Sequence, residues 1–162
     1  MTFKEALEIA SGPPSPDDRF IEACTVVVTA PESTAHYRVE ALVSRGIGYL
    51  LGQQHVKALS DLDEAVRLNP NFDRSYVNRA ALHSMLGDDQ MALSDFNRSI
   101  DLNPTNPIAY VGRGQLFRRL GMIDRAIVDV GMARAFDEGN PHIERLWEQL
   151  LDESWEAAPK QN

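Results

Sequence analysis

The sequence repeats its own pattern at one fixed spacing, which is the distance from Asn69 to Asn103. Asn69-Pro70 recurs as Asn103-Pro104, and Asn106-Pro107 recurs as Asn140-Pro141. Arginines, aspartates and alanines keep the same spacing at Arg45, Arg79, Arg113, Asp61, Asp95, Asp129, Ala58, Ala92 and Ala126. Self-similarity at a fixed period marks a repeat architecture, because one small unit cannot bury its apolar face unless neighbours stack on it. The period therefore predicts a stack of like units that presents a docking surface.

The composition is that of one folded soluble domain, with 162 residues of which 43% are hydrophobic. The formal net charge of -8 argues against general affinity for nucleic acid or anionic membranes, since both need basic faces. No apolar run is long enough to span a membrane, and the first residues lack the regions of a signal peptide. We therefore expect a cytoplasmic protein, with a periplasmic or secreted location open if a signal peptide has been removed. The single Cys24 forms no intrachain disulfide, and its apolar surroundings predict a buried packing residue.

Each regular unit is predicted to be two helices joined by a tight turn. In the second unit, residues 73–86 and 90–102 carry helical periodicity on either side of Gly87-Asp88. Gly87 and Gly121 stand where a chain leaving a helix turns left-handed, a conformation that glycine adopts at low cost. Asn106 before Pro107 has the form of a helix N-cap followed by proline in the first turn.

Both ends of the chain carry extra helices. Residues 3–10 and 17–29 are predicted helices separated by a proline-rich break, and we assign residues 1–38 to an N-terminal helical cap or degenerate repeat. Residues 141–157 are predicted to form a C-terminal capping helix. Its apolar residues recur at helical spacing as Ile143, Leu146, Trp147, Leu150, Leu151 and Trp155. Residues 158–162 are predicted to be a disordered tail.

The recurring positions resemble the tetratricopeptide repeat (TPR) family over residues 39–140, with a family-like cap to about residue 157. The family signature is a large residue, Leu-Gly, an aromatic residue, then Ala, Phe, Ala and Pro at fixed offsets. The matching residues are Gly46, Tyr49, Ala58, Leu62, Ala65, Pro70, Tyr76, Ala80, Gly87, Ala92, Phe96, Ser99, Pro104, Tyr110, Gly114, Phe117, Gly121, Ala126, Val130, Ala133 and Phe136. The resemblance implies TPR 1 (39–72), TPR 2 (73–106) and TPR 3 (107–140), stacked as an all-α right-handed superhelix of antiparallel helix pairs.

Three positions depart from the family pattern. The first repeat is expected to turn at Gly52, one residue early, and His83 stands where an aromatic residue is usual. The third repeat ends at residues 137–139 without a proline. These departures affect where individual turns are expected, and they do not change the predicted architecture.

Most of what recurs has a structural explanation. Each repeated arginine precedes its aspartate by 16 residues, which places the two side chains opposite each other in a helix hairpin. We favour a salt bridge that joins the two helices over a ladder of charges for an ionic ligand. The pairs are Arg45 with Asp61, Arg79 with Asp95, and Arg113 with Asp129. Ala58, Ala92 and Ala126 are expected where the second helix of each repeat closely approaches the first, because a larger residue would overpack.

The resemblance also implies a concave groove lined by the first helix of each repeat. The residues expected to contact a partner are Val43, Ile47, Leu50, Arg74, Val77, Asn78, Met85, Val111, Gln115, Arg118 and Arg119. The early positions are apolar and the late ones basic, which favours a partner that is acidic or has a free carboxylate. Two alternatives stay open: the N-terminal helix covers the apolar half, and the basic half is a solvated face.

One TPR subclass binds the C-terminal carboxylate of chaperones with lysine, asparagine and arginine side chains on the first helices of its repeats. Here only Asn78 matches that pattern. Val43, Ile47, Ile108 and Gly112 stand at other clamp positions. We therefore expect peptide binding without this clamp.

The sequence predicts a non-catalytic protein–protein interaction scaffold, an adaptor or assembly factor that binds a peptide or helix in the groove. One alternative is a structural module that self-associates into homo-oligomers, with Trp147 and Trp155 as contacts. A further alternative is a regulatory domain that senses a small ligand, which would need a closed apolar cavity. No enzyme, metal or cofactor is expected, because the four histidines are scattered and no nucleophile is paired with a base.

Overall fold

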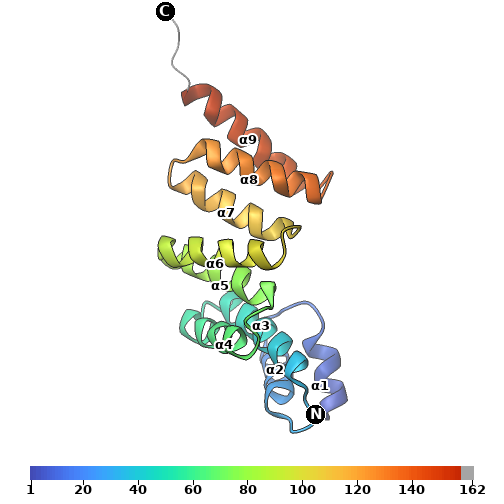
Figure 1. Ribbon diagram of the computed structural model, residues 1–162. Coiled ribbons are helices and arrows are strands. Elements are labelled where there is room, and N and C mark those ends of the chain that lie inside the picture. Colours follow the sequence, from blue (N-terminus) through green and yellow to red (C-terminus); the bar gives the residue numbers. More distant parts are fainter. Residues whose placement is uncertain (158–162) are drawn as a thin grey trace, which may run out of the picture. The chain divides into compact units, whose positions relative to one another are not determined.

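The computed structural model describes residues 1–157, which contain nine α-helices and no strand (Figure 1). In chain order the helices are α1 (Phe3–Ala10), α2 (Asp18–Thr29), α3 (Ala35–Leu51), α4 (His55–Leu68), α5 (Asp73–Leu86), α6 (Asp89–Leu102), α7 (Pro107–Arg119), α8 (Ile123–Phe136) and α9 (Pro141–Ala157). The all-α, TPR-type fold class is confirmed. The predicted tail at 158–162 lies outside the described residues.

The chain divides into two compact units, Met1–Leu82 and a second that begins at His83, so the boundary falls inside α5. In the first unit α2 packs against both α1 and α3, and α3 packs against α4. In the second unit the neighbouring pairs are α6 with α7, α7 with α8, and α8 with α9. Each unit is therefore a layer of helices in which chain neighbours are also neighbours in space.

The helices begin where their capping residues stand. Asp17 accepts a hydrogen bond from the Phe20 N–H and starts α2, and Asn106 accepts one from the Ile108 N–H at the start of α7. Helix α3 begins at Ala35, four residues before the predicted first residue of TPR 1 at 39. Thr34 caps this helix and its side chain accepts a hydrogen bond from the Tyr37 N–H. A Thr cap without a following proline is a weaker signal than the Asn-Pro starts.

Each unit has its own apolar core. In the first unit α1 and α2 bury one cluster that includes Phe20 and Cys24. Burial raises the pKa of the Cys24 thiol to about 12, so this cysteine is a packing residue, as predicted. In the second unit α9 buries an apolar stripe against α8. Its members are Ile143, Leu146 and Leu150.

Small residues set how closely the helices of a hairpin approach. A Cβ atom on Gly46 would lie 3.1 Å from Leu62 Cγ, and one on Gly114 would lie 2.9 Å from Val130 Cγ2. Across the hairpins the facing alanines are fully buried at Ala58, Ala92 and Ala126. The small-residue positions of the repeat therefore have the packing role that the sequence predicts.

The turn between the two helices of a repeat needs one residue with left-handed backbone. Gly87 and Gly121 have φ of 84° and 74°, as predicted. In the first repeat the expected turn residue, Gly52, has φ of -83°, and the left-handed residue is Gln53 with φ of 58°. Gln53 lies one full repeat period before Gly87, so the turn keeps the period and the prediction of an early turn was wrong. The residue after the left-handed one closes the turn, because its backbone N–H donates to the carbonyl five residues earlier. The N···O distance is 2.8 Å from Gln54 to Tyr49 and 2.9 Å from Asp88 to His83.

We predict that Gln53→Gly raises the free energy of unfolding by about 0.5–1 kcal/mol, because glycine removes the cost of left-handed backbone at a side-chain-bearing residue. Chemical denaturation measures the change. Gly121→Ala is the matched control, and its free energy of unfolding should fall by about 1 kcal/mol. A Cβ there would meet no atom within 4 Å, so that loss reports on the backbone alone. Loss of stability in Gln53→Gly would contradict the assignment.

Two of the three recurring arginine–aspartate pairs lie within single units and are present. Arg45 Nε and Nη2 donate to the Asp61 carboxylate at 2.7 and 2.8 Å, and Arg113 makes the same two bonds to Asp129. These forked bonds raise the pKa of both arginines. The side chains of Arg113 and Asp129 are only 20% and 5% exposed. The Arg79–Asp95 pair joins residues of different units and stays a prediction.

Each arginine also reaches back to an earlier helix, which the sequence analysis missed. Arg113 Nη1 donates to Asn97 Oδ1 at 2.6 Å, and Arg79 Nη1 donates to Asp63 Oδ1 at 2.8 Å. Asp63 and Asn97 are themselves one repeat period apart, so the signal was in the sequence. In the second unit one guanidinium therefore joins α6, α7 and α8.

We predict that Arg113→Ala lowers the free energy of unfolding by about 3 kcal/mol, because it leaves the buried Asp129 carboxylate without its partner. The matched control is Arg67→Ala. Arg67 makes the same forked contact to Glu64, but its side chain is 68% exposed, so solvent screens the pair and its loss should change stability far less. Equal losses in the two variants would show that the Arg113 pair does not stabilise the hairpin.

Two buried serines break the pattern of small apolar residues. Ser75 and Ser99 are fully buried, and neither hydroxyl has a hydrogen-bond partner among the described residues. The other repeats have alanine at these positions, at Ala41, Ala109, Ala65 and Ala133. Each serine therefore carries a desolvated polar group that its alanine counterparts lack.

Ser99→Ala should raise the free energy of unfolding by about 1 kcal/mol, because it removes a buried hydroxyl without removing a contact that the hydroxyl makes. Thermal and urea denaturation both report it. Ser60→Ala, on the exposed side of α4, controls for the difference in helix propensity between serine and alanine. It should raise the free energy of unfolding by about 0.5 kcal/mol or less. A destabilised Ser99→Ala would show that the hydroxyl has a bonding role.

Candidate functional site

The apolar positions predicted to line the groove are largely buried. Val43 is 0% exposed and Val77 is 5% exposed, so neither presents a surface to a partner. Ile47 and Leu50 are half-buried in the same core cluster as Val43. Val28 of α2 packs against that cluster, which favours the alternative in which the N-terminal helices cover this region. The assignment of Val43 and Val77 as contact residues was wrong, because repeat offset gives a helix face but does not tell which neighbour covers it.

The polar groove residues of the first unit lie beside a small crevice. Arg74 is exposed, and its guanidinium lies 3.7 Å from the Glu40 carboxylate. The Asn78 amide donates at 2.7 Å to the backbone carbonyl of Arg74 and is occupied locally. The crevice has a volume of about 180 Å³. Its lining mixes apolar and polar side chains of α1, α2, α3 and α5, including Leu7, Ala10, Val27, Tyr37, Ser44 and Arg74. It is smaller than the roughly 300–1,000 Å³ typical of ligand pockets and is not a closed apolar cavity.

In the second unit the groove positions are more open. Met85 is 64% exposed, and Gln115 is also exposed. Ile108, which stands at one of the clamp positions of the chaperone-binding subclass, is 67% exposed. Gln115 follows Ile108 by two helical turns, so the two side chains lie along one side of α7. Val111 lies between them and is half-buried against the core.

The two basic groove residues are already engaged within the protein. Arg118 Nε lies 2.9 and 3.1 Å from the two carboxylate oxygens of Glu153 on α9, and its Nη2 also bonds to Glu153. This bonding raises the pKa of Arg118. Arg119 Nη2 donates to the Ser84 carbonyl at 3.1 Å and to Asp89 at 2.5 Å. The basic half is therefore neutralised by internal partners, and neither arginine is a free cation.

The sequence analysis did not assign a role to the α9 partners of Arg118. Glu153 accepts its forked bonds, and Gln149 accepts a further one at 3.3 Å. Glu153 lies one repeat period after Arg119, and Gln149 lies one repeat period after Gln115. Extending the period into the last helix would have found both. In the second unit α9 therefore stands in the position of a further first helix.

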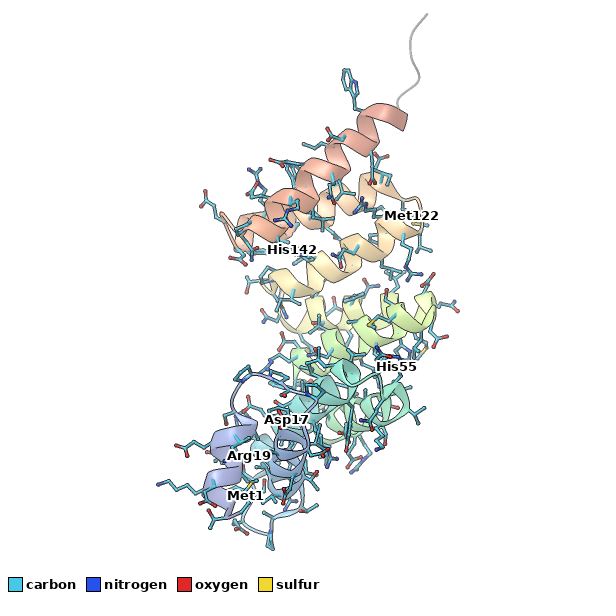
Figure 2. All side chains as sticks on the ribbon, turned by 180° about the vertical axis from the view of Figure 1, so that it is seen from behind. Met1, Asp17, Arg19, His55, Met122 and His142 are labelled. Carbon is cyan, nitrogen blue, oxygen red and sulfur yellow. The ribbon has the colours of Figure 1, made fainter. Side chains whose placement is uncertain are left out.

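No group of three or more His, Cys, Asp or Glu residues that could hold a metal occurs within residues 1–157. No helix in the same range is long and apolar enough to cross a membrane. His83 is buried at the end of α5, which fits its expected packing role. In Figure 2, His142 at the start of α9 and Met122 in the α7–α8 turn lie at opposite ends of the second unit's helices.

The chain is similar in sequence to one family model and in structure to several solved domains. Residues 73–106 match the model described as tetratricopeptide repeat. The TPR domain of Arabidopsis OM64 is 25% identical, with 74% of this chain and 99% of that chain covered and a TM-score of 0.69. MamA is 22% identical over 85% of this chain and 78% of its own, with a TM-score of 0.70. The first TPR of Spaghetti (RPAP3), bound to the HSP90 peptide SRMEEVD, is 20% identical over 72% and 93%, with a TM-score of 0.68.

No curated protein matches the chain in sequence. The matched segment coincides with α5, α6 and their connections, and it has the predicted boundaries of TPR 2. Hairpins with the same period precede and follow it, as α3–α4 and α7–α8. Residues 73–106 are therefore a tetratricopeptide repeat, and the fold of the chain is similar to that of TPR domains.

Proposed function

We propose that this protein is a non-catalytic interaction scaffold that binds a peptide or helix of a partner protein along the exposed side of α7. We call this surface the α7 face and define it by Ile108, Val111, Gln115, Arg118 and Arg119, with Met85 beside it. The observation that carries the proposal is the open line from Ile108 to Gln115. Exposed apolar side chains beside polar groups are typical of interaction sites.

The position of Met85 extends this surface. Arg119 bonds to Ser84, which places the end of α5 next to the end of α7. Met85 is therefore close to Arg119 and supplies a second exposed apolar side chain. Methionine suits such a site, because its unbranched side chain adapts to different partner surfaces. The bound HSP90 peptide in the first TPR of Spaghetti (RPAP3) supports a peptide as the type of ligand.

The internal ion pairs change what the partner must provide. A carboxylate of the partner can reach Arg118 or Arg119 only in competition with Glu153 or Asp89. We therefore expect Ile108 and Met85 to supply most of the affinity, and the arginines to orient the partner. Gly112 cannot be replaced by a clamp residue without repacking, because a Cβ there would lie 2.4 Å from Phe96 Cε1. We accordingly do not expect the carboxylate clamp of the chaperone-binding subclass.

A photo-crosslinking amino acid at Ile108 tests the proposal. We expect crosslinks to one partner protein, with the crosslinked peptides mapping to a single extended or helical segment. Ile108→Asp should reduce recovery of that partner by about tenfold or more, because it places a charge at the apolar contact. Pull-down with quantitative mass spectrometry measures the recovery.

Val56 offers a matched control, since it is 86% exposed at the start of α4. Val56→Asp should leave partner recovery unchanged, and circular dichroism should show both variants folded. Equal recovery by Ile108→Asp and wild type would remove the α7 face from the proposal. Crosslinks only to a second copy of this chain would instead support the alternative of homo-oligomerisation.

A further inference from the structure

The outward side of α9 exposes a large aromatic residue. Trp155 is 85% exposed, and Leu151, one turn earlier on the same side, is 44% exposed. Tryptophan is usually well buried on average, and it is enriched among the residues that dominate binding at interfaces. The apolar stripe that docks α9 uses other residues, Ile143, Leu146 and Leu150. Packing of α9 therefore does not account for Trp155 and Leu151.

Helix α8 adds a third exposed apolar side chain to this region. Arg134 Nε bonds to Glu144 at 2.7 Å, and a Cβ on Gly131 would lie 3.1 Å from Trp147 Cζ3. These two contacts set an antiparallel register in which Val128 lies at the level of Leu151. Val128 is one turn before Gly131 on the same side of α8, and it is 65% exposed. We call Val128, Leu151 and Trp155 the outer patch.

Carboxylates flank the outer patch without forming ion pairs. Glu148 and Asp152 are exposed on α9, each within one turn of Leu151. Neither makes an ion pair with another residue of the described range, whereas Glu144 and Glu153 are held by Arg134 and Arg118. Arg145 on α9 is also exposed, but it is ten residues before Trp155, or about 15 Å along the helix. Within the described part of α9, the charges nearest Trp155 are therefore negative, while the exposed Arg125 lies one turn before Val128 on α8.

We propose that the outer patch binds a basic amphipathic segment of a partner protein, in which lysine or arginine side chains flank an apolar stripe. Trp155, Leu151 and Val128 would bury the apolar stripe. Glu148 and Asp152 would pair with the cations, and the exposed indole face of Trp155 adds a cation–π contact. The net charge of -8 steers a basic segment towards the protein. The outer patch shares no residue with the α7 face, so each site can fail independently of the other.

A synthetic amphipathic helix made of leucine and lysine serves as the probe. Fluorescence anisotropy of the labelled peptide measures its binding to the full chain at low salt. We expect saturable binding that shifts the tryptophan emission of the wild type to shorter wavelength. The same peptide with glutamate in place of lysine should not bind. Binding of both peptides alike would overturn the assigned charge preference.

Matched variants separate the outer patch from general charge attraction. Trp155→Ala and the double variant Glu148→Lys/Asp152→Lys should each weaken peptide binding by about tenfold or more. The control Glu8→Lys/Glu22→Lys changes the net charge by the same amount at exposed residues of α1 and α2. It should weaken peptide binding by less than about threefold. Circular dichroism should show all of them folded, since every changed residue is exposed.

Three results would overturn the proposal. The first is an equal loss of binding in the two double variants, which would mean that only net charge matters. The second is unchanged binding by Trp155→Ala. The third is absence of peptide binding together with concentration-dependent self-association that Trp155→Ala abolishes in light scattering. That last result would assign the outer patch to a second copy of the chain.

Discussion

The close approach of the two helices in each hairpin is the constraint on which the rest of the structure depends. Glycine or alanine stands at each contact point because a larger side chain would push the helices apart, as the 2.9 Å approach of Gly114 to Val130 shows. Only at this separation can Arg113 reach Asp129 with both ends of its guanidinium and still bond to Asn97. The recurring residues therefore depend on one another. The small residues let the helices approach closely, and at that distance the arginine bonds across three helices.

Because the recurring residues are used for packing, recognition must rely on residues that differ between repeats. Burial and internal ion pairs reduce the number of these residues that are available to a partner. Val43, Ile47 and Leu50 of the first unit belong to its own core, and Arg118 and Arg119 of the second unit are paired with Glu153 and Asp89. What stays open is mostly apolar or neutral, namely Ile108, Gln115 and Met85 on one surface and Trp155 with Leu151 on another. Charge then acts mainly at the margins of these surfaces, where solvent weakens it.

Helix α9 has more than one structural task. Its apolar stripe covers the last hairpin, which is what a capping helix must do because stacked repeats leave one face uncovered. Glu153 and Gln149 also occupy Arg118, so the same helix decides whether that cation is available. Its remaining side carries Trp155 and carboxylates outside any ion pair of the described residues. A helix read from the sequence as a cap therefore also shapes the surfaces that a partner would meet.

Most helix boundaries, the TPR-type fold and the residues that pack the hairpins follow from the sequence, because a fixed repeat period sets local geometry and nearest-neighbour contacts. The sequence located the left-handed turns at Gly87 and Gly121, and it misplaced only the one at Gln53, where a glycine one residue earlier misled the prediction. Tertiary structure alone decided exposure. Whether Val43 faces a partner or a core depends on α2, and whether Arg118 is free or paired depends on α9. Helix α2 carries no copy of the repeat signature, so the period could not reveal that it packs against the core cluster that contains Val43.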